Sequence, residues 1–313
     1  MVFSPAQLHI PDGFLTIAVS LIFWLITVIM VGLAVVKTNQ SLGEKQIPLM
    51  GVMAAFIFAA QMLNFPIAGG TSGHFLGGAL ASIILGPWAG ILVMTAVVGV
   101  QALLFQDGGL LVMGANIFNM GILTAVIGYG LYRIVLHQKR GLRLVFSGGA
   151  AWIATMAAAL MTSLQLWLSG TTRLEIVLPA MLGLHALIGV GEAIITVAAL
   201  GYIEKSRPDL LDGEKNSPEG GKGWIAAGIV FSLLAVLLSP FASSNPDGLE
   251  RVAADLGFLA NGVDVPYQVL PDYTIPFLGE TAFSTILAGI VGAIVIFGLI
   301  ILVGRNFGRK NQS

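Results

Sequence analysis

The segment Leu8-His9-Ile10-Pro11-Asp12-Gly13-Phe14-Leu15 is the polar start of a long apolar run that begins at about residue 15. Pro-Asp-Gly favours a tight turn, because proline presets φ, aspartate bonds to its own backbone and glycine accepts the reversal. The turn predicts that His9, one of four histidines in the chain, is held at the mouth of the first helix. Since imidazole is a common ligand of transition metals, we expect His9 to form half of a metal site.

The composition places the chain in a lipid bilayer. It is 56% hydrophobic and 10% charged, whereas an average soluble domain is roughly 25% charged. Only helices and closed barrels satisfy their backbone in a bilayer, and these apolar runs lack the strict alternation of barrel strands. We therefore predict an all-α polytopic membrane protein. The net charge of −1 argues against a nucleic-acid partner, and the absence of cysteine excludes disulfides and thiolate metal ligands.

Charge decides how many times the chain crosses the membrane. The apolar runs that could form spans of ~20 residues are residues 15–36, 47–63, 75–86, 88–105, 115–136, 149–169, 179–203, 224–240 and 282–304. Gly86-Pro87 separates the third run from the fourth, since proline removes a backbone donor. If these two cross separately and the 37–45 loop is cytoplasmic, 13 of the 15 Lys and Arg residues lie inside, as the positive-inside rule requires. We predict about nine transmembrane helices, with the N-terminus outside and the C-terminus cytoplasmic.

This topology places His9 and the loop 64–74 on the same outer face. The loop contains Gly69, Gly70 and Gly73, which permit close backbone approach, and it ends in His74. A helix-capping histidine in a flexible loop is the alternative to a ligand, but the shared face with His9 favours the ligand. We expect His9 and His74 to bind one transition-metal ion. His137, in the basic inner loop, is interpreted as a solvated residue.

Polar side chains in or beside the spans form a second group of candidates, because such groups are costly in a bilayer and usually face a bundle interior or cavity. They could orient the metal ligands, serve in coupling, or hydrogen-bond helices together. They are Asp12, Asn64, Gln101, Asn116, Asn119, His185 and Glu192. The spacing puts Asn116 and Asn119 on one helical face, and likewise His185 and Glu192. Asp107, in Asp107-Gly-Gly, is interpreted as a turn residue.

Several of these segments carry a family resemblance. His9-Ile-Pro-Asp-Gly13, Asn64–His74, Phe105-Gln-Asp-Gly-Gly109 and His185–Glu192 resemble the substrate-binding membrane subunit of cobalt/nickel energy-coupling-factor (ECF) transporters, the CbiM/NikM family. Residues 224–304 are similar to the small CbiN/NikN accessory subunit, whose outer loop contains Pro246-Asp-Gly-Leu-Glu250 (PDGLE). The resemblance implies a seven-helix metal-binding part over 8–203, a cytoplasmic linker over 204–223 and a two-helix accessory part over 224–304, in a prokaryotic plasma membrane.

The resemblance also implies a ligand set. In this family the chain begins Met-His, and the terminal amine, the backbone nitrogen and imidazole of that histidine, and a second loop histidine form a square plane. By position these roles fall to His9 and His74, and such donors suit Ni(II) or Cu(II). Leu8 stands in place of the methionine and can give a terminal amine only if the chain starts there. We expect the functional protein to start at residue 8; the alternative is a modified site with solvent or Asp12 as fourth ligand.

The function implied by the resemblance is that of the substrate-specific membrane component of an ECF-type ABC importer. Its cargo would be Ni²⁺ or Co²⁺, with nickel slightly favoured, and it would hold no permanent cofactor. An ATPase and a coupling transmembrane subunit would come from separate chains, since the sequence has no G-x-x-x-x-G-K-[ST] loop. A stand-alone secondary transporter is the alternative, and an intramembrane metal hydrolase a less favoured one. We also expect the acidic loop 241–281 to contact the outer face near His9 and to help the metal load.

Overall fold

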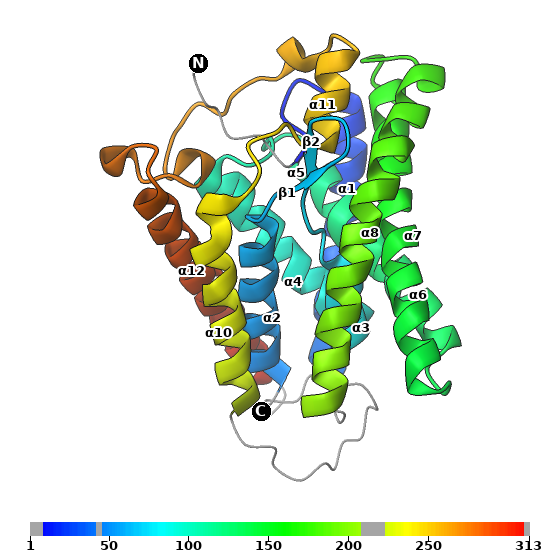
Figure 1. Ribbon diagram of the computed structural model, residues 1–313, viewed down its shortest axis with the longest axis vertical. Helices are drawn as coiled ribbons and strands as arrows, with labels where there is room; N and C mark the ends of the chain where they lie inside the picture. The colour runs from blue at the N-terminus through cyan, green and yellow to red at the C-terminus, as the bar shows by residue number, and fades with distance from the viewer. Residues whose placement is uncertain (1–8, 42–45, 208–222, 310–313) are drawn as a thin grey trace.

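The computed structural model describes residues 9–41, 46–207 and 223–309 of the 313-residue chain. Its first part contains α1 (Ile17–Ser41), α2 (Gln46–Gln61), the strands β1 (Phe65–Ile67) and β2 (Thr71–Gly73), α3 (Gly78–Leu85), α4 (Pro87–Val100), η1 (Gln101–Phe105), α5 (Met113–Ile117), η2 (Phe118–Leu123), α6 (Thr124–Ile134), α7 (Arg140–Leu168) and α8 (Leu174–Ser206). Its second part contains α10 (Gly223–Leu238), η3 (Ser239–Phe241), α11 (Gly248–Asp255), the short turns η4 (Leu259–Asn261), η5 (Pro271–Tyr273) and η6 (Pro276–Leu278), and α12 (Ala282–Arg309). The elements stand as a helical bundle (Figure 1).

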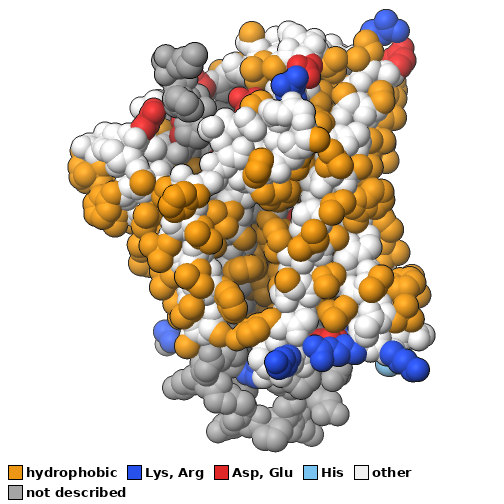
Figure 2. Space-filling view, in the orientation of Figure 1, with side chains coloured by type: hydrophobic (Ala, Val, Ile, Leu, Met, Phe, Trp, Pro, Cys, Tyr) orange, Lys and Arg blue, Asp and Glu red, His pale blue; other side chains and the backbone are white. Residues whose placement is uncertain are grey.

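The all-α membrane architecture is confirmed. Within the described residues, 6 helices are long and apolar enough to cross a bilayer, and the apolar helices Gln46–Gln61 and Ile225–Phe241 are shorter. Apolar side chains cover the flank of the bundle, as expected for a surface in contact with lipid (Figure 2). The number of nine spans stays a prediction.

The expected helix over 75–86 is wrong in its extent. Only Gly78–Leu85 is helical, 8 residues long, which at ~1.5 Å per residue covers ~12 Å of a hydrocarbon core ~30 Å thick. Gly77 adopts a left-handed conformation at φ 84°, and residues 74–76 before it are not helical. This irregular backbone is buried inside the bundle, where other protein groups satisfy it. The predicted break at Gly86-Pro87 is confirmed, with Gly86 at φ 82° and Pro87 as the first residue of α4.

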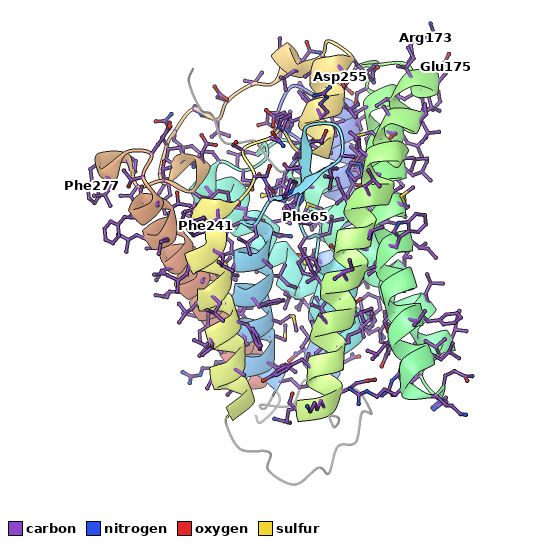
Figure 3. The ribbon with its side chains drawn as sticks, viewed as in Figure 1. Phe65, Arg173, Glu175, Phe241, Asp255 and Phe277 are labelled. Atoms are coloured by element: carbon purple, nitrogen blue, oxygen red, sulfur yellow. The ribbon has the colours of Figure 1, made fainter. Side chains whose placement is uncertain are left out.

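Charged side chains gather at the two ends of the bundle. At one end, Arg140 and Arg143 lie 3.0 and 2.6 Å from the carboxylate of Glu204, which joins the start of α7 to the end of α8. At the opposite end lie Arg173 and Glu175, on the same side as α11 (Figure 3). Figure 2 shows most of the visible Lys and Arg at the first end. This distribution is the one the charge argument requires, and the orientation in the membrane stays a prediction.

The second part of the chain packs directly on the first. Helices α10 and α12 lie against α2 (Figure 1). Glycine permits this closeness at Gly292, where a side chain would overlap Phe58 of α2. The connection between α10 and α12 crosses the end of the bundle that carries the hairpin β1–β2. The two parts therefore form one hydrophobic core that contains Phe58, Phe105 and Tyr273.

Backbone hydrogen bonds fix that connection to the first part. Ser72 N–H donates to Pro246 C=O at 2.8 Å, Ser243 N–H to Asn64 C=O at 2.7 Å, and Leu270 N–H to Leu104 C=O at 2.9 Å. Near the N-terminal segment, Val263 N–H donates to Asp12 C=O at 2.8 Å. The expected contact between the loop 241–281 and the end that carries His9 is present in the structure.

Candidate metal centre

The segment that follows His9 is held by a turn and by its aspartate. Gly13 takes φ 90°, and Phe14 N–H reaches back to Pro11 C=O, so the predicted Pro-Asp-Gly turn is confirmed. The Asp12 carboxylate accepts hydrogen bonds from the consecutive N–H groups of residues 110, 111 and 112 at 3.0, 2.9 and 3.1 Å. A side chain at Gly109 would overlap this carboxylate. Asp12 therefore fixes the N-terminal segment to the residues just before α5, and both of its carboxylate oxygens accept hydrogen bonds.

The imidazole of His9 is buried against Asp107. Its Nδ1 lies 3.0 Å from an Asp107 carboxylate oxygen and 3.1 Å from the Asp107 carbonyl oxygen. Gly108 makes the approach possible, because a Cβ there would lie 2.7 Å from the Cβ of His9. Burial opposes both charges, but each group stabilises the other. The Asp107 carboxylate raises the pKa of His9 above its usual value, and His9 lowers the pKa of Asp107.

A tyrosine from the second part of the chain hydrogen-bonds to the aspartate of this pair. The hydroxyl of Tyr273 donates to the second Asp107 oxygen at 2.6 Å and accepts from Gln101 Nε2 at 3.1 Å. Its ring stacks on Phe105, with centroids 4.7 Å apart and planes inclined by 19°. Burial, and then the neighbouring Asp107 carboxylate, raise the pKa of Tyr273, so its hydroxyl stays protonated and acts as the donor.

His74 lies close to His9 and follows the β1–β2 hairpin. Strands β1 and β2 pair antiparallel, Phe65 opposite Gly73, and His74 follows β2 directly. The backbone beyond it is fixed by Glu192 of α8, whose two oxygens accept from Leu76 N–H at 2.6 Å and Gly77 N–H at 2.9 Å. Glu192 thus holds the backbone between His74 and α3 in place by hydrogen bonds.

The two rings meet at a small cavity. The ring centroids of His9 and His74 lie 6.0 Å apart in an edge-on arrangement. The cavity has a volume of about 50 Å³, and His185 and Asp247 also line it. That volume holds an ion with a few waters, whereas pockets for small organic molecules measure ~300–1,000 Å³. An ion-sized cavity with three imidazoles and a carboxylate is suited to a transition-metal dication.

Unused ring nitrogens mark this cavity as a place for a ligand. In the part of the chain that the structure describes, the buried atoms His9 Nε2 and His74 Nδ1 have no hydrogen-bond partner. Such orphaned polar atoms require an explanation, and a metal ion provides one. The side chains are not drawn together around an ion: the described residues contain no group of three or more His, Asp or Glu placed to hold one. Closure on a metal requires the rings to move inward.

His185 and Asp247 also line the cavity. His185 Nδ1 lies 2.8 Å from Met181 C=O one turn earlier on α8, so this nitrogen carries the proton and Nε2 the lone pair. Asp247 is the aspartate of the PDGLE sequence. One of its oxygens accepts from Glu250 N–H and caps α11, while the other lies 3.5 Å from His74 Nδ1. The second part of the chain thus brings a carboxylate to the second histidine.

The amide candidates divide into positioning groups and helix contacts. Asn116 accepts from Ile10 N–H and donates to Ile10 C=O, both at 3.0 Å, and so fixes the backbone next to His9. Asn119 exchanges hydrogen bonds with Gln165 of α7 at 2.7 and 2.9 Å, which joins helices. Asn64 contributes its backbone carbonyl to the contact with Ser243 and does not line the cavity. Gln101 acts through Tyr273.

Three residues of the site were missed in the sequence. Asp107 was interpreted as a turn residue, although a carboxylate among so few, at the end of an apolar run, is a signal of a paired charge. The acidic loop 241–281 contains Asp247, but nothing in its sequence singles out that residue or Tyr273. The contact of Tyr273 with Asp107 joins residues 166 positions apart, and no local pattern indicates it.

The predicted chelate at His9 stays a prediction. A ring closed through the backbone nitrogen of His9 needs Nδ1, the ring nitrogen nearer to Cβ, and Asp107 engages that atom. The amine expected from Leu8, and the expected start at residue 8, concern residues outside the described part of the chain. In this conformation the other ring nitrogen, Nε2 of His9, is the one without a hydrogen-bond partner among the described residues.

Fold and site together define a class: a multi-pass membrane protein with histidines around an ion-sized cavity at one end of its bundle. Comparisons with known proteins identify the family. Residues 9–210 match the model of the CbiM family, described as the cobalt uptake substrate-specific transmembrane region, and residues 222–309 match the PDGLE domain. The chain belongs to the CbiM family, with a PDGLE domain following it, and is a multi-pass membrane protein of a prokaryote.

Individual relatives agree with the family match. A putative fused nickel transport protein of Archaeoglobus fulgidus is 38% identical over 299 residues, covering 93% of this chain and 96% of the relative. A putative metal transport protein of Haloquadratum walsbyi is 47% identical over 210 residues, covering 65% of this chain and 93% of the relative. A crystal structure of a transition metal transporter is 34% identical with a TM-score of 0.58, covering 66% of this chain and 96% of that one.

Proposed function

We propose that the chain is the substrate-specific membrane component of an ECF-type importer that captures a divalent transition metal at the outer face. The observation that carries this proposal is the cavity of about 50 Å³ lined by His9, His74 and His185. Two of these rings have a buried nitrogen without a partner among the described residues. Imidazole suits Ni and Co, and the two carboxylates beside the rings favour a dication.

Nickel is favoured over cobalt as the cargo. Nitrogen-rich sites suit Ni(II), and a relative aligned with 93% of this chain is named a putative fused nickel transport protein. The family model, in contrast, is named for cobalt uptake. Metal content of the purified protein after growth with both ions decides between the two.

The energy for uptake is assigned to partner subunits. The sequence contains no phosphate-binding loop of the G-x-x-x-x-G-K-[ST] type. A separate ATPase and a coupling membrane subunit would supply hydrolysis and movement, so the chain itself is a transporter component and not an enzyme. Genes for both subunits beside this one would support the assignment.

A stand-alone secondary transporter is the alternative. Such a protein uses ionisable groups within the membrane as ion relays. Glu192 is the buried carboxylate available for this role, and both of its oxygens hold backbone N–H groups. Uptake by this chain alone that an uncoupler abolishes would favour the alternative, whereas uptake that needs the ATPase subunit favours the importer.

Replacement of His74 tests the proposed metal site. His74→Ala removes one of the two rings with an unused nitrogen, and we expect high-affinity binding of Ni²⁺ and Co²⁺ to be lost while membrane insertion is retained. His137→Ala is the matched control, because that histidine lies in the loop between α6 and α7, away from the cavity. Metal content measured by mass spectrometry gives the answer, and an unchanged metal stoichiometry in His74→Ala contradicts the two-histidine site.

A further inference from the structure

Four basic side chains gather at the end of the bundle where α6 leads into α7. Arg133 lies in the last turn of α6, Lys139 directly precedes α7, and two further arginines, Arg140 and Arg143, lie in the first turn of α7. Glu204 pairs with the two arginines of α7, and its side chain is 4% exposed. Arg133 and Lys139 are exposed. The corner between the two helices is therefore a basic surface patch.

This positive charge is unfavourable for α7 itself. The N-terminus of a helix carries partial positive charge and favours anions, yet the first turn of α7 contains two arginines and no acidic residue. Glu204 offsets part of this repulsion from the end of α8. A bound anion would be stabilised by the remaining cations and would also relieve the helix end.

An exposed apolar strip on α7 begins directly beside the patch. Leu142, Phe146 and Ile153 are 44%, 50% and 45% exposed. Together with Lys139 and Gly149 they recur every three or four residues, and such a spacing places them on one face of the helix. The surface is open at Gly149, because a Cβ added there would have no neighbouring side chain within 4 Å among the described residues. Figure 2 shows Lys and Arg side chains at this end of the bundle, below an apolar flank.

We propose that this face of α6 and α7 binds an anionic phospholipid from the leaflet at the same end of the bundle. Arg133, Lys139 and Arg140 hold the phosphate, since clusters of Lys and Arg beside a membrane helix attract anionic headgroups. One acyl chain lies along the strip from Leu142 to Ile153.

The continuity of charge and apolar surface selects this occupant. A soluble anion would use the cations alone, and an uncharged lipid would use the strip alone. A phospholipid with a negative headgroup uses both at once, with its chain parallel to the helix. In the predicted orientation this leaflet is the cytoplasmic one, where anionic lipids produce a negative surface potential. The inference does not depend on the proposed function.

Lipid binding to the purified full-length protein tests the headgroup contacts. Native mass spectrometry with dioleoyl phosphatidylglycerol and dioleoyl phosphatidylcholine compares two lipids that have the same acyl chains. We expect phosphatidylglycerol to bind more tightly, and Arg133→Gln and Lys139→Gln each to weaken its binding about fivefold. Arg173→Gln is the matched control, because that side chain is 73% exposed at the opposite end of the bundle (Figure 3). Its affinity is expected to equal that of the wild type.

A second pair of variants tests the apolar strip. Gly149→Leu fills the open part of the strip, and we expect the affinity for phosphatidylglycerol to fall severalfold. Gly32→Leu is the control, because Gly32 of α1 is also exposed and has no neighbouring side chain within 4 Å of an added Cβ among the described residues. Leucine suits both apolar surfaces, so both variants are expected to keep the thermal midpoint of the wild type.

The outcomes separate this proposal from its alternatives. Equal affinities for the two lipids overturn it, and so does unchanged binding of phosphatidylglycerol in both glutamine variants. Displacement of the lipid by soluble glycerol 3-phosphate assigns the patch to a free anion and overturns the lipid. Unchanged affinity in Gly149→Leu overturns the placement of the acyl chain. Ni²⁺ affinity is expected to stay at the wild-type value in all these variants, so the proposed function is tested separately by His74→Ala.

Discussion

Replacement of Asp12 by alanine is expected to loosen the His9 segment from the rest of the bundle, even with no metal present. The carboxylate accepts three hydrogen bonds from consecutive backbone N–H groups before α5. Alanine leaves all three donors without this acceptor. The turn, the contact of Asn116 with Ile10 and the contact of His9 with Asp107 remain, so the segment weakens without being released.

The magnitude follows from these three bonds. A hydrogen bond to a charged group contributes about 1.5–3 kcal/mol when buried and less where water competes. Asp12 is half-buried, so about 1 kcal/mol for each bond is a reasonable value, and Asp12→Ala is expected to cost ~2–4 kcal/mol. Asp12→Asn keeps one acceptor oxygen and places an amide donor against the remaining N–H, with an expected cost of ~1–2 kcal/mol.

The assay is thermal unfolding of the purified, metal-free protein. For a chain longer than 200 residues, ~2 °C of midpoint per kcal/mol is the expected conversion, so Asp12→Ala should unfold about 4–8 °C below the wild type. Membrane proteins often unfold irreversibly, and the heating rate must therefore be held constant. Asp255→Ala is the control, because this carboxylate is 57% exposed and forms a surface ion pair with Arg251, worth little to stability.

The same variants distinguish a structural role of Asp12 from metal binding by Asp12. A structural role predicts that the unfolding midpoint of the metal-free protein falls and that metal affinity falls with it, since His9 is less well held. If the metal-free midpoint of Asp12→Ala equals that of the wild type while metal affinity drops, Asp12 binds the ion, and the argument from its three hydrogen bonds is refuted.

Three further predictions follow from contacts at the site and in the core. Glu192→Gln keeps one oxygen for the two N–H groups just before α3; we expect the thermal midpoint to fall, and an unchanged midpoint would contradict its role in holding this backbone. Asp247→Ala removes the cap of α11 and the carboxylate near His74, so Ni²⁺ affinity should fall several-fold in competition assays, whereas Asp255→Ala should retain it. Gly292→Leu places a side chain on Phe58 between α12 and α2; overpacking of ~1–3 kcal/mol should lower the midpoint, and wild-type stability would show that the two helices can separate freely.

The parts of the fold that local chemistry determines could be predicted from the sequence. The Pro-Asp-Gly turn, the break at Gly86-Pro87 and the apolar helices all follow from residues close together in the chain. Residues 75–77 were assigned to a helix because an apolar run does not distinguish helix from extended chain when both are buried. The structure separates them at Gly77, where φ is 84°, and Glu192 and Gln61 hold this segment by hydrogen bonds from distant parts of the chain.

The candidate site likewise has features that the sequence predicts and features that depend on distant contacts. The convergence of His9 and His74 could be predicted, because charge placed both on one face. The roles of Asp107, Tyr273 and Asp247 could not, since each depends on a partner at least 98 positions away. A short local pattern also misled: Asp-Gly-Gly is typical of a turn, and here the glycines are needed because His9 and Asp12 approach residues 108 and 109 closely.

The arrangement of the site explains why the two parts benefit from being in one chain. The first part supplies the rings of His9, His74 and His185, and the second supplies Tyr273 and Asp247, which meet the Asp107–His9 pair and His74 respectively. The family matches divide between residues 210 and 222, so each half of this set lies in a different domain. A covalent connection gives the two domains a high effective concentration for each other. Side-chain contacts that would be weak between separate chains can then hold a histidine in one orientation.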